Sequence, residues 1–162
     1  MKVEQARRPE APAVAAVLQE AAQWLATGGR PLWSTAEVSD ERVSRDTEVG
    51  LFFVARADGE VAGVMKFELD DPYFWPEVPS GTSAFVHKLA VRRAWAKKGV
   101  STELLTFARA RAQGLGLRHL RLDCRADRVG LCQLYERFRF ELHSHVLRGA
   151  NTFARYELKI GG

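Results

Sequence analysis

The chain has 162 residues, of which 46% are hydrophobic and 27% are charged, and its formal net charge is +4. This length and mixture predict one soluble globular domain that buries its core without disulfide staples. The modest positive charge suits an anionic ligand such as a phosphate, and it suits solubility alone equally well.

The beginning of the chain contains no long apolar run, so we expect neither a signal peptide nor a membrane anchor. The two cysteines, Cys124 and Cys132, form no CxxC motif and no Cys/His cluster with zinc spacing. They are therefore expected to be buried free thiols in a reducing, cytoplasmic setting. His143 and His145 alternate on one segment but have no visible third ligand, and no metal site is expected.

Hydrophobic periodicity and turn residues predict strands and helices that alternate along the whole chain. In order, they are a strand at 2–7, a helix from Pro9 and Pro12 to about 26, a helix at 39–47, strands at 51–57, 60–69 and 84–92, a helix at 100–113, a strand at 118–124, a helix at 129–138, and strands at 139–147 and 152–160.

Two of these connections carry information on topology. Asp58-Gly59, between two apolar runs, predicts an antiparallel hairpin because both residues tolerate positive φ. The strand–helix–strand unit over 84–124 predicts a parallel pair. The segment 70–81 is rich in proline and aromatic residues and is expected to be a loop with Phe74 and Trp75 at its tip. The fold class is therefore α/β, with a mixed sheet and helices on both faces.

The segment 87–105 contains five cationic residues before a helix that Gly99 precedes, and no acidic residue interrupts it until Glu103. The first turn of a helix presents free amide groups and a partial positive charge, so residues 97–102 are a candidate phosphate cradle. Ser101 and Thr102 add hydroxyl donors. The alternative is a loop with a solvated basic face. Neither GxxxxGK[ST] nor GxGxxG is present.

Two motifs in the chain resemble those of the GNAT superfamily of N-acetyltransferases. The first is similar to its acetyl-CoA-binding motif and reads Leu89-Ala90-Val91, then Ala96-Lys97-Lys98-Gly99-Val100-Ser101. The second, usually "N…LYEKLGF", runs here from Arg128 through Leu134-Tyr135-Glu136 to Arg139-Phe140. The order of elements is also similar to the family's across essentially the whole chain.

Four positions depart from the family pattern. Ala96 stands where Gln or Arg is usual, Lys97 where many members have Gly, Arg128 in place of the common Asn, and Arg139 in place of the Gly of "GF". Most contacts of such a cradle come from backbone amides, so the first two changes weaken the match without removing it. Added positive charge at Lys97 is expected to favour phosphate binding.

The resemblance implies a mostly antiparallel sheet with a central, splayed parallel pair, over a single domain spanning 1–162. It also implies acetyl-CoA as co-substrate. The residues it assigns to acetyl-CoA binding are Leu89, Ala90, Val91, Ala96, Lys97, Lys98, Gly99, Val100, Ser101, Thr102 and Arg128. Tyr135 falls on the family's usual general acid, which protonates the leaving thiolate.

The remaining candidates concern the base and the acceptor. His87, on the strand before the cradle, and Glu68 are candidate bases for the amine proton; a structural His and a solvated carboxylate are the alternatives. Trp33, Phe74 and Trp75 are candidates for the apolar wall of the acceptor site, and Asp70, Asp71 and Glu77 could attract a cationic amine. The alternative for these residues is a hydrophobic plug with solvated loop charges.

The function implied by the resemblance is transfer of the acetyl group from acetyl-CoA to a primary amine of a small molecule or peptide by direct attack. One alternative is an acyl-CoA-binding protein with little or no catalysis. Another is a basic nucleic-acid-binding module, but its arginines at 109, 111, 118, 121, 125 and 128 show no aromatic stacking ladder. We therefore expect no nucleic-acid or membrane partner. Dimers through C-terminal strands are common in the family.

Overall fold

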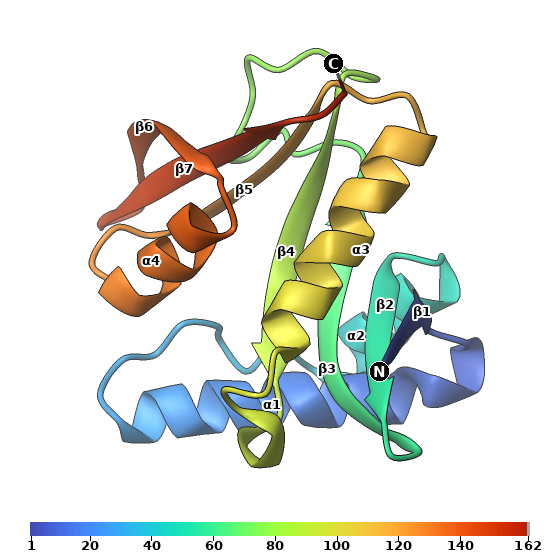
Figure 1. The fold of residues 1–162 in the computed structure, drawn as a ribbon. Coiled ribbons are helices and arrows are strands. Elements are labelled where there is room, and N and C mark those ends of the chain that lie inside the picture. The colour runs from blue at the N-terminus through green and yellow to red at the C-terminus, as the bar shows by residue number, and fades with distance from the viewer. Residues whose placement is uncertain (162) are drawn as a thin grey trace. The chain divides into compact units, whose positions relative to one another are not determined.

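The computed structural model of the chain describes residues 1–161 and contains seven strands and four α-helices (Figure 1). The strands are β1 (Lys2–Gln5), β2 (Phe52–Ala57), β3 (Glu60–Glu68), β4 (Ser83–Val91), β5 (His119–Arg125), β6 (Glu141–Arg148) and β7 (Asn151–Lys159). The helices are α1 (Ala11–Thr27), α2 (Asp40–Glu48), α3 (Val100–Gly114) and α4 (Val129–Arg137). The predicted order of elements is confirmed. Two 3₁₀ turns, Arg8–Glu10 and Arg93–Trp95, were not predicted.

The strands follow the order β1-β2-β3-β4-β5-β7-β6 in one mixed sheet. β4 and β5 are parallel, and β1–β2, β2–β3, β5–β7 and β6–β7 are antiparallel. Within the described residues, the parallel ladder joins Ser83–Phe85 to His119–Arg121 and so covers the first third of β4. The predicted mixed α/β fold with a parallel pair is confirmed.

By its contacts the chain divides into two compact units, each built from two segments. Unit 1 comprises Met1–Phe67 and Lys88–Leu104, and unit 2 comprises Glu68–His87 and residues 105–161. The chain therefore changes unit three times: at the end of β3, inside β4 between His87 and Lys88, and inside α3. The single domain expected from the sequence stays a prediction.

The core of unit 1 forms between the two N-terminal helices and the first strands. α1 contributes Val14, Val17 and Leu18, which are fully buried on one face of the helix. Val43 of α2 and Phe52 of β2 belong to the same cluster, with others from β2, β3 and β4. Ser39 caps α2, because its hydroxyl accepts a hydrogen bond from the Arg42 amide at 3.2 Å.

The turn between β2 and β3 has the geometry that its sequence predicts. Asp58 and Gly59 both have positive φ, 50° and 78°, and Ala57 pairs directly with Glu60 across the turn. A two-residue turn with this handedness matches the right-handed twist of the flanking strands. The predicted hairpin is confirmed.

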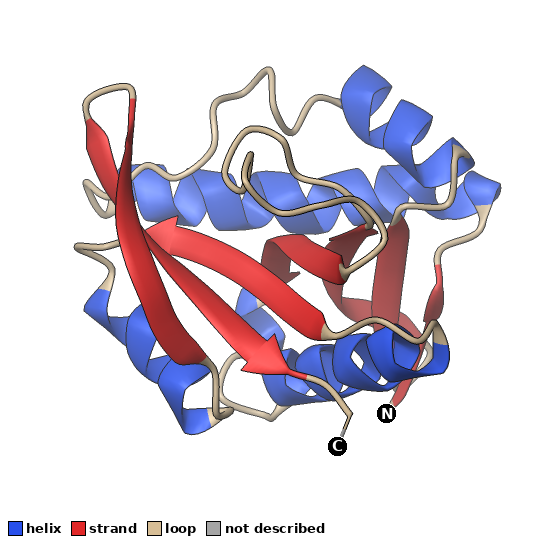
Figure 2. Cartoon of the chain, turned by 90° about the horizontal axis from the view of Figure 1, so that it is seen from above, coloured by secondary structure: helices blue, strands red, loops and turns tan. Residues whose placement is uncertain are grey.

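Unit 2 consists of the loop between β3 and β4, the first part of β4, the α3 residues from Leu105 onward, β5, α4 and the β6–β7 hairpin. β6 and β7 form the long two-stranded ribbon seen in Figures 1 and 2. Alternate residues of β5, including Leu120 and Leu122, are fully buried, whereas the intervening side chains are half-buried. Adjacent residues of β5 therefore face opposite sides of the sheet. No helix in residues 1–161 is long and apolar enough to cross a bilayer.

Candidate functional site

The predicted cradle lies in unit 1, where the chain leaves β4 and enters α3. After the 3₁₀ turn Arg93–Trp95, Lys97 and Gly99 both adopt positive φ, 61° and 84°, and α3 begins at Val100. Turns that contain left-handed residues direct successive amides into a shared concavity that can hold an anion. A Cβ added at Gly99 would meet no atom within 4 Å, so a ligand has room to approach this backbone.

The amides that open α3 add to this concavity. An α-helix offers no internal acceptor to the amides of its first turn. Among the described residues, only the last of α3's first four amides, that of Glu103, donates back, to the Gly99 carbonyl at 3.0 Å. The amides of Val100, Ser101 and Thr102 are therefore left for an external acceptor, and the partial positive charge of the helix end favours an anion there.

Close packing fixes the start of α3 against the strands of unit 1. A Cβ on Gly63 of β3 would lie 2.6 Å from Val100 Cγ1 and 3.0 Å from the Ala90 carbonyl oxygen. Only glycine allows so close an approach of β3 to these groups. Gly63 therefore positions the cradle, and nothing in the sequence motif pointed to it.

Three of the five cations in this segment have partners elsewhere in unit 1. Lys88 pairs with Glu37 at 3.2 Å, and Arg92 with Glu20 at 3.0 Å. The Arg93 guanidinium lies 3.7 Å from the centre of the Trp24 ring. Lys97 and Lys98 are exposed at the cradle, and Lys98 Nζ lies 5.2 Å from the Trp95 ring centre. Within residues 87–105, the charge available to a phosphate is thus concentrated at 97 and 98.

A second polar cluster lies in unit 2, around His87 of β4. His87 Nε2 lies 3.0 Å from Asp71 Oδ2 and 3.9 Å from Glu68 Oε1, while Nδ1 lies 4.0 Å from Asp123 Oδ2. The side chains of Asp71 and Asp123 are only 6% and 8% exposed, and that of His87 is 19% exposed. The structure thus brings together both predicted bases and adds two carboxylates.

These carboxylates control the protonation of His87. Burial alone lowers the pKa of His87, but the neighbouring carboxylates, first Asp71 and then Asp123 and Glu68, outweigh it and raise the pKa above its usual 6.5. Burial raises the pKa of Asp71, and contact with His87 outweighs this and lowers it below 3.8. His87 and Asp71 therefore form an ion pair over the interval between these two pKa values.

The same group has the composition of a metal site. Asp71, His87 and Asp123 offer ligand atoms within 4.8 Å of one another, and no other group in residues 1–161 does so. Within this group, Asp71 approaches Nε2 of the ring and Asp123 approaches Nδ1. The expectation of no metal stays a prediction.

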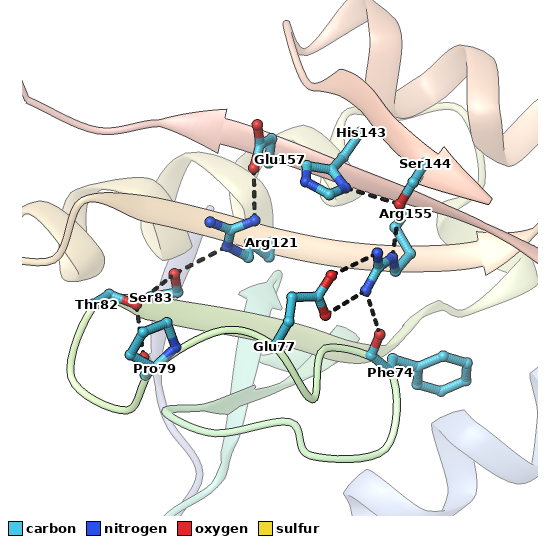
Figure 3. Close-up of polar contacts among 10 residues, drawn as sticks. All are labelled: Phe74, Glu77, Pro79, Thr82, Ser83, Arg121, His143, Ser144, Arg155 and Glu157. Carbon is cyan, nitrogen blue, oxygen red and sulfur yellow. Dashed lines mark hydrogen bonds and ion pairs between the residues drawn. The ribbon is translucent and has the colours of Figure 1, made fainter. Parts of the chain in front are cut away.

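The loop between β3 and β4, which carries Asp71, is anchored by two arginines of unit 2 (Figure 3). Arg155 of β7 donates to both carboxylate oxygens of Glu77 at 2.8 Å and to the Phe74 carbonyl at 2.9 Å. This pairing lowers the pKa of Glu77 to about 2. Arg121 of β5 donates to Ser83 at 3.0 Å and to Glu157 at 2.6 Å.

Trp75 is held between these two arginines. Its ring centre lies 4.8 Å from the Arg121 guanidinium and 4.4 Å from that of Arg155, and the residue is 1% exposed. The expectation that Trp75 lines an open acceptor site is therefore corrected: it is the plug of the loop. Glu77 is likewise committed to Arg155.

The other two predicted wall residues lie in different units. Phe74 packs edge-on against Phe153, with centroids 4.9 Å apart, and its centroid lies 6.5 Å from that of His87. Trp33 packs on the unit 1 core, and Lys88 Nζ lies 5.7 Å from its ring centre. Phe74 thus adjoins the His87 cluster, and the acceptor role of both residues stays a prediction.

Comparison with known proteins decides the family. Residues 18–140 match the model of the acetyltransferase (GNAT) family. This chain belongs to the GNAT family. The uncharacterized N-acetyltransferase YesJ of Bacillus subtilis (strain 168) is 28% identical over 155 residues, covering 90% of this chain and 84% of YesJ.

Solved GNAT structures share the fold at low sequence identity. A GNAT acetyltransferase from Listeria monocytogenes has a TM-score of 0.79 at 20% identity, covering 98% of this chain and 94% of that one. YncA of Salmonella typhimurium, a putative acetyltransferase solved with acetyl-CoA, has a TM-score of 0.77 at 14% identity, covering 100% and 95%. PaiA N-acetyltransferase of Thermoplasma acidophilum, solved with coenzyme A, has a TM-score of 0.73 at 17% identity, covering 98% of each chain. Acetyl-CoA is the family's co-substrate.

Two departures from the GNAT motifs adopt a left-handed backbone conformation that favours glycine. Lys97 and Arg139 stand where glycine is usual, and both have positive φ, 61° and 88°. A side chain in this region is strained by about 1–2 kcal/mol. Both positions thus carry a side chain in a glycine-like turn, with local strain.

The other residues predicted from the GNAT motifs lie as follows. Leu89–Val91 end β4 in unit 1, with Ala90 buried. Arg128 precedes the first turn of α4 in unit 2, with a side chain 10% exposed and Nε 4.0 Å from Asp127. Tyr135 of α4 is 5% exposed and packs against Phe140 and Tyr156, with centroids 6.0 and 6.1 Å away. Burial raises the pKa of Tyr135, which keeps its phenol protonated.

Asp123 is the residue of the His87 cluster that the sequence did not indicate, and Asp71 had been assigned to amine attraction instead of to His87. The alternation of β5 places Asp123 opposite to the buried Leu122 and Cys124. That signal says which face of the strand the carboxylate occupies, but the partner on that face depends on pairing between distant segments.

Proposed function

We propose that this protein is an acetyl-CoA-dependent N-acetyltransferase whose acceptor is a primary amine of a small molecule or peptide. The observation that carries the proposal is the cradle of unit 1: two left-handed residues followed by the free amides of α3's first turn. The cradle's amides, with Lys97 and Lys98 beside them, suit the phosphate groups of a coenzyme A derivative.

Acetyl-CoA would supply the acetyl group as a thioester. The residues of unit 1 that would hold it are Leu89–Val91 through their backbone and the cradle residues 96–102. Lys97 has a positive φ although it carries a side chain, so a lysine at this position of the motif does not remove the turn.

His87 is the proposed general base. A protonated amine cannot attack, so a group must accept its proton. His87 is held through Nε2 by Asp71, with Asp123 beside Nδ1 and Glu68 at the exposed edge of the cluster. Because its pKa is raised, the neutral, proton-accepting form of His87 grows as pH rises above 6.5.

Tyr135 is the proposed general acid. Its raised pKa keeps it in the phenol form throughout the working pH range, so that a proton is available for the departing thiolate. The three carboxylates around His87 favour an acceptor that arrives as a cation, because an ammonium group is attracted to negative charge.

The test is calorimetric titration of the purified protein with acetyl-CoA, with CoA and ATP as controls. Micromolar binding of acetyl-CoA that is much tighter than that of ATP is the expected result, and a screen of primary amines would then give turnover. Tight binding without turnover on any amine would favour the acyl-CoA-binding alternative. No binding at all would overturn the proposal.

A further inference from the structure

The protein's only two cysteines lie in contact in unit 2. Cys124 is near the end of β5 and Cys132 is in the first turns of α4, and their sulfur atoms are 3.5 Å apart. Both are free thiols. The sequence contains no other cysteine, so within this chain each thiol can form a disulfide only with the other.

The distance is short enough for a bond to form with small movements. A disulfide requires sulfur atoms about 2.05 Å apart, so the two must approach by roughly 1.5 Å. α4 is a short helix of nine residues. A movement of its first turns toward β5 by this distance would bring the two sulfur atoms within bonding range.

Unequal exposure gives the two thiols different roles. Cys132 is half-buried, whereas Cys124 is 5% exposed. Burial, followed by the contact with Cys132, raises the pKa of the Cys124 thiol. An oxidant therefore reaches Cys132 first, and Cys124 acts second, as the resolving thiol.

A disulfide between Cys124 and Cys132 would affect the residues of α4 that lie beside the two thiols. Tyr135 and Glu136 follow Cys132 by three and four residues and so share its side of α4. Tyr135 is buried there, and Glu136 accepts a hydrogen bond from the Tyr156 hydroxyl at 2.8 Å. Drawing the first turn of α4 toward β5 moves the tyrosine that is the proposed general acid.

We propose that Cys124 and Cys132 are a redox-sensitive modification site that closes to a reversible intramolecular disulfide and thereby displaces Tyr135. With a low-molecular-weight disulfide such as glutathione disulfide, the Cys132 thiolate attacks one sulfur and releases one glutathione. Cys124 then loses its proton to solvent and attacks the Cys132 sulfur, which releases the second glutathione. The protein loses two hydrogen atoms and the oxidant gains them.

The His87 cluster should not respond to this change. Asp123 and Cys124 are neighbours on β5, so their side chains point to opposite faces of the strand. The disulfide forms on the face toward α4, and the ion pair of His87 with Asp71 lies on the other. A selective effect on α4 is therefore expected.

The experiment treats the reduced wild-type protein with glutathione disulfide and follows three readouts: intact mass with free-thiol counting, backbone amide NMR, and amine acetylation. We expect both thiols to disappear with loss of two hydrogen atoms in a monomer, shifts in the α4 amides, and a fall in kcat of about tenfold or more that dithiothreitol reverses. A displacement near 1 Å can cost about a hundredfold.

Cys132→Ser is the matched control and, because the residue is half-buried, is expected to fold and to keep the reduced protein's activity in the presence of oxidant. A stable glutathione adduct, an intermolecular disulfide or unchanged thiols in the wild type would overturn the proposal. So would a disulfide that leaves the α4 amides unshifted. The activity readout rests on the proposed function; if the reduced protein never turns over, that function fails, while mass and NMR still decide the disulfide.

Discussion

The cradle in unit 1 and the His87 cluster in unit 2 are built in different ways. The cradle is one continuous segment, residues 97–102, and presents backbone amides that a turn and a helix end leave free. The cluster gathers side chains from β3, β4, β5 and the loop after β3, and acts through carboxylates placed around one imidazole.

This difference explains which substitutions each region tolerates. A backbone cradle survives a change of side chain if the chain still adopts the same φ values, as Lys97 does at 61°. A side-chain cluster does not survive removal of a member, because the remaining buried charges lose their partner. The four predictions below use this contrast, in order of decreasing effect.

Removing the imidazole should have the largest effect. His87→Ala is expected to lower kcat for amine acetylation by about 10²–10⁴-fold, because the amine loses its proton acceptor, and to leave acetyl-CoA affinity unchanged. Steady-state kinetics and calorimetry measure the two quantities. His145→Ala, at an exposed site on β6, is the control and should behave as wild type. Equal kcat in both variants would remove His87 from the mechanism.

Filling the close approach beneath the cradle should come next. Gly63→Ala forces a methyl group against Val100 and the Ala90 carbonyl, and is expected to lower the free energy of unfolding by about 1–3 kcal/mol and to weaken acetyl-CoA binding. Denaturant unfolding and calorimetry measure these changes. Gly130→Ala, in open space on α4, is the control and should be neutral or slightly stabilising. A Gly63→Ala protein with wild-type affinity would show that the cradle does not depend on this packing.

Asp71→Asn should change the pH dependence. Asp71 raises the pKa of His87, so its loss lowers that pKa, and the rise of kcat/KM with pH should begin at a lower pH than in wild type. The ion pair stabilises the fold between the carboxyl's usual 3.8 and the imidazole's usual 6.5, and this contribution fades outside that window. Asp70→Asn is the control, since Asp70 is exposed. A profile that does not move would separate Asp71 from His87.

Restoring glycine at the strained turns should have the smallest effect and the opposite sign. Lys97→Gly and Arg139→Gly are each expected to stabilise the protein by about 1 kcal/mol, because glycine adopts positive φ without strain. Lys97→Gly should also keep acetyl-CoA affinity within roughly fivefold, since one exposed cation contributes less than about 1 kcal/mol. Lys98→Gly, where φ is not positive, should not stabilise. If Lys97→Gly abolished binding, the cradle would depend on the side chain.

The sequence predicted most of the fold and one of these two regions. The order of elements, the Asp58-Gly59 turn and the start of α3 follow from local periodicity and turn chemistry, and all three are confirmed. The family's turns at Lys97 and Arg139 were marked as departures, because a sequence shows the side chain and not the φ value beneath it.

The sequence predicted only two members of the His87 cluster, and the reason is physical. Glu68 ends β3 and His87 lies within β4, and the hydrophobic pattern located both strands. The positions of Asp71 and Asp123 depend instead on a loop and a non-local strand pairing. The burial of Trp75 was not predicted for the same reason. Two arginines from β5 and β7 enclose its ring, and no local pattern predicts contacts with residues some 45 to 80 positions away.

The enclosure of Trp75 also makes the loop observable. Of the four tryptophans, Trp24, Trp33 and Trp95 belong to unit 1 and Trp75 alone to unit 2. With the first three replaced by phenylalanine, the remaining indole would emit from a water-free position between two guanidinium groups. Release of the loop would expose it and shift its fluorescence to longer wavelengths. The protein thus contains an intrinsic optical probe of the segment that holds Asp71 against His87.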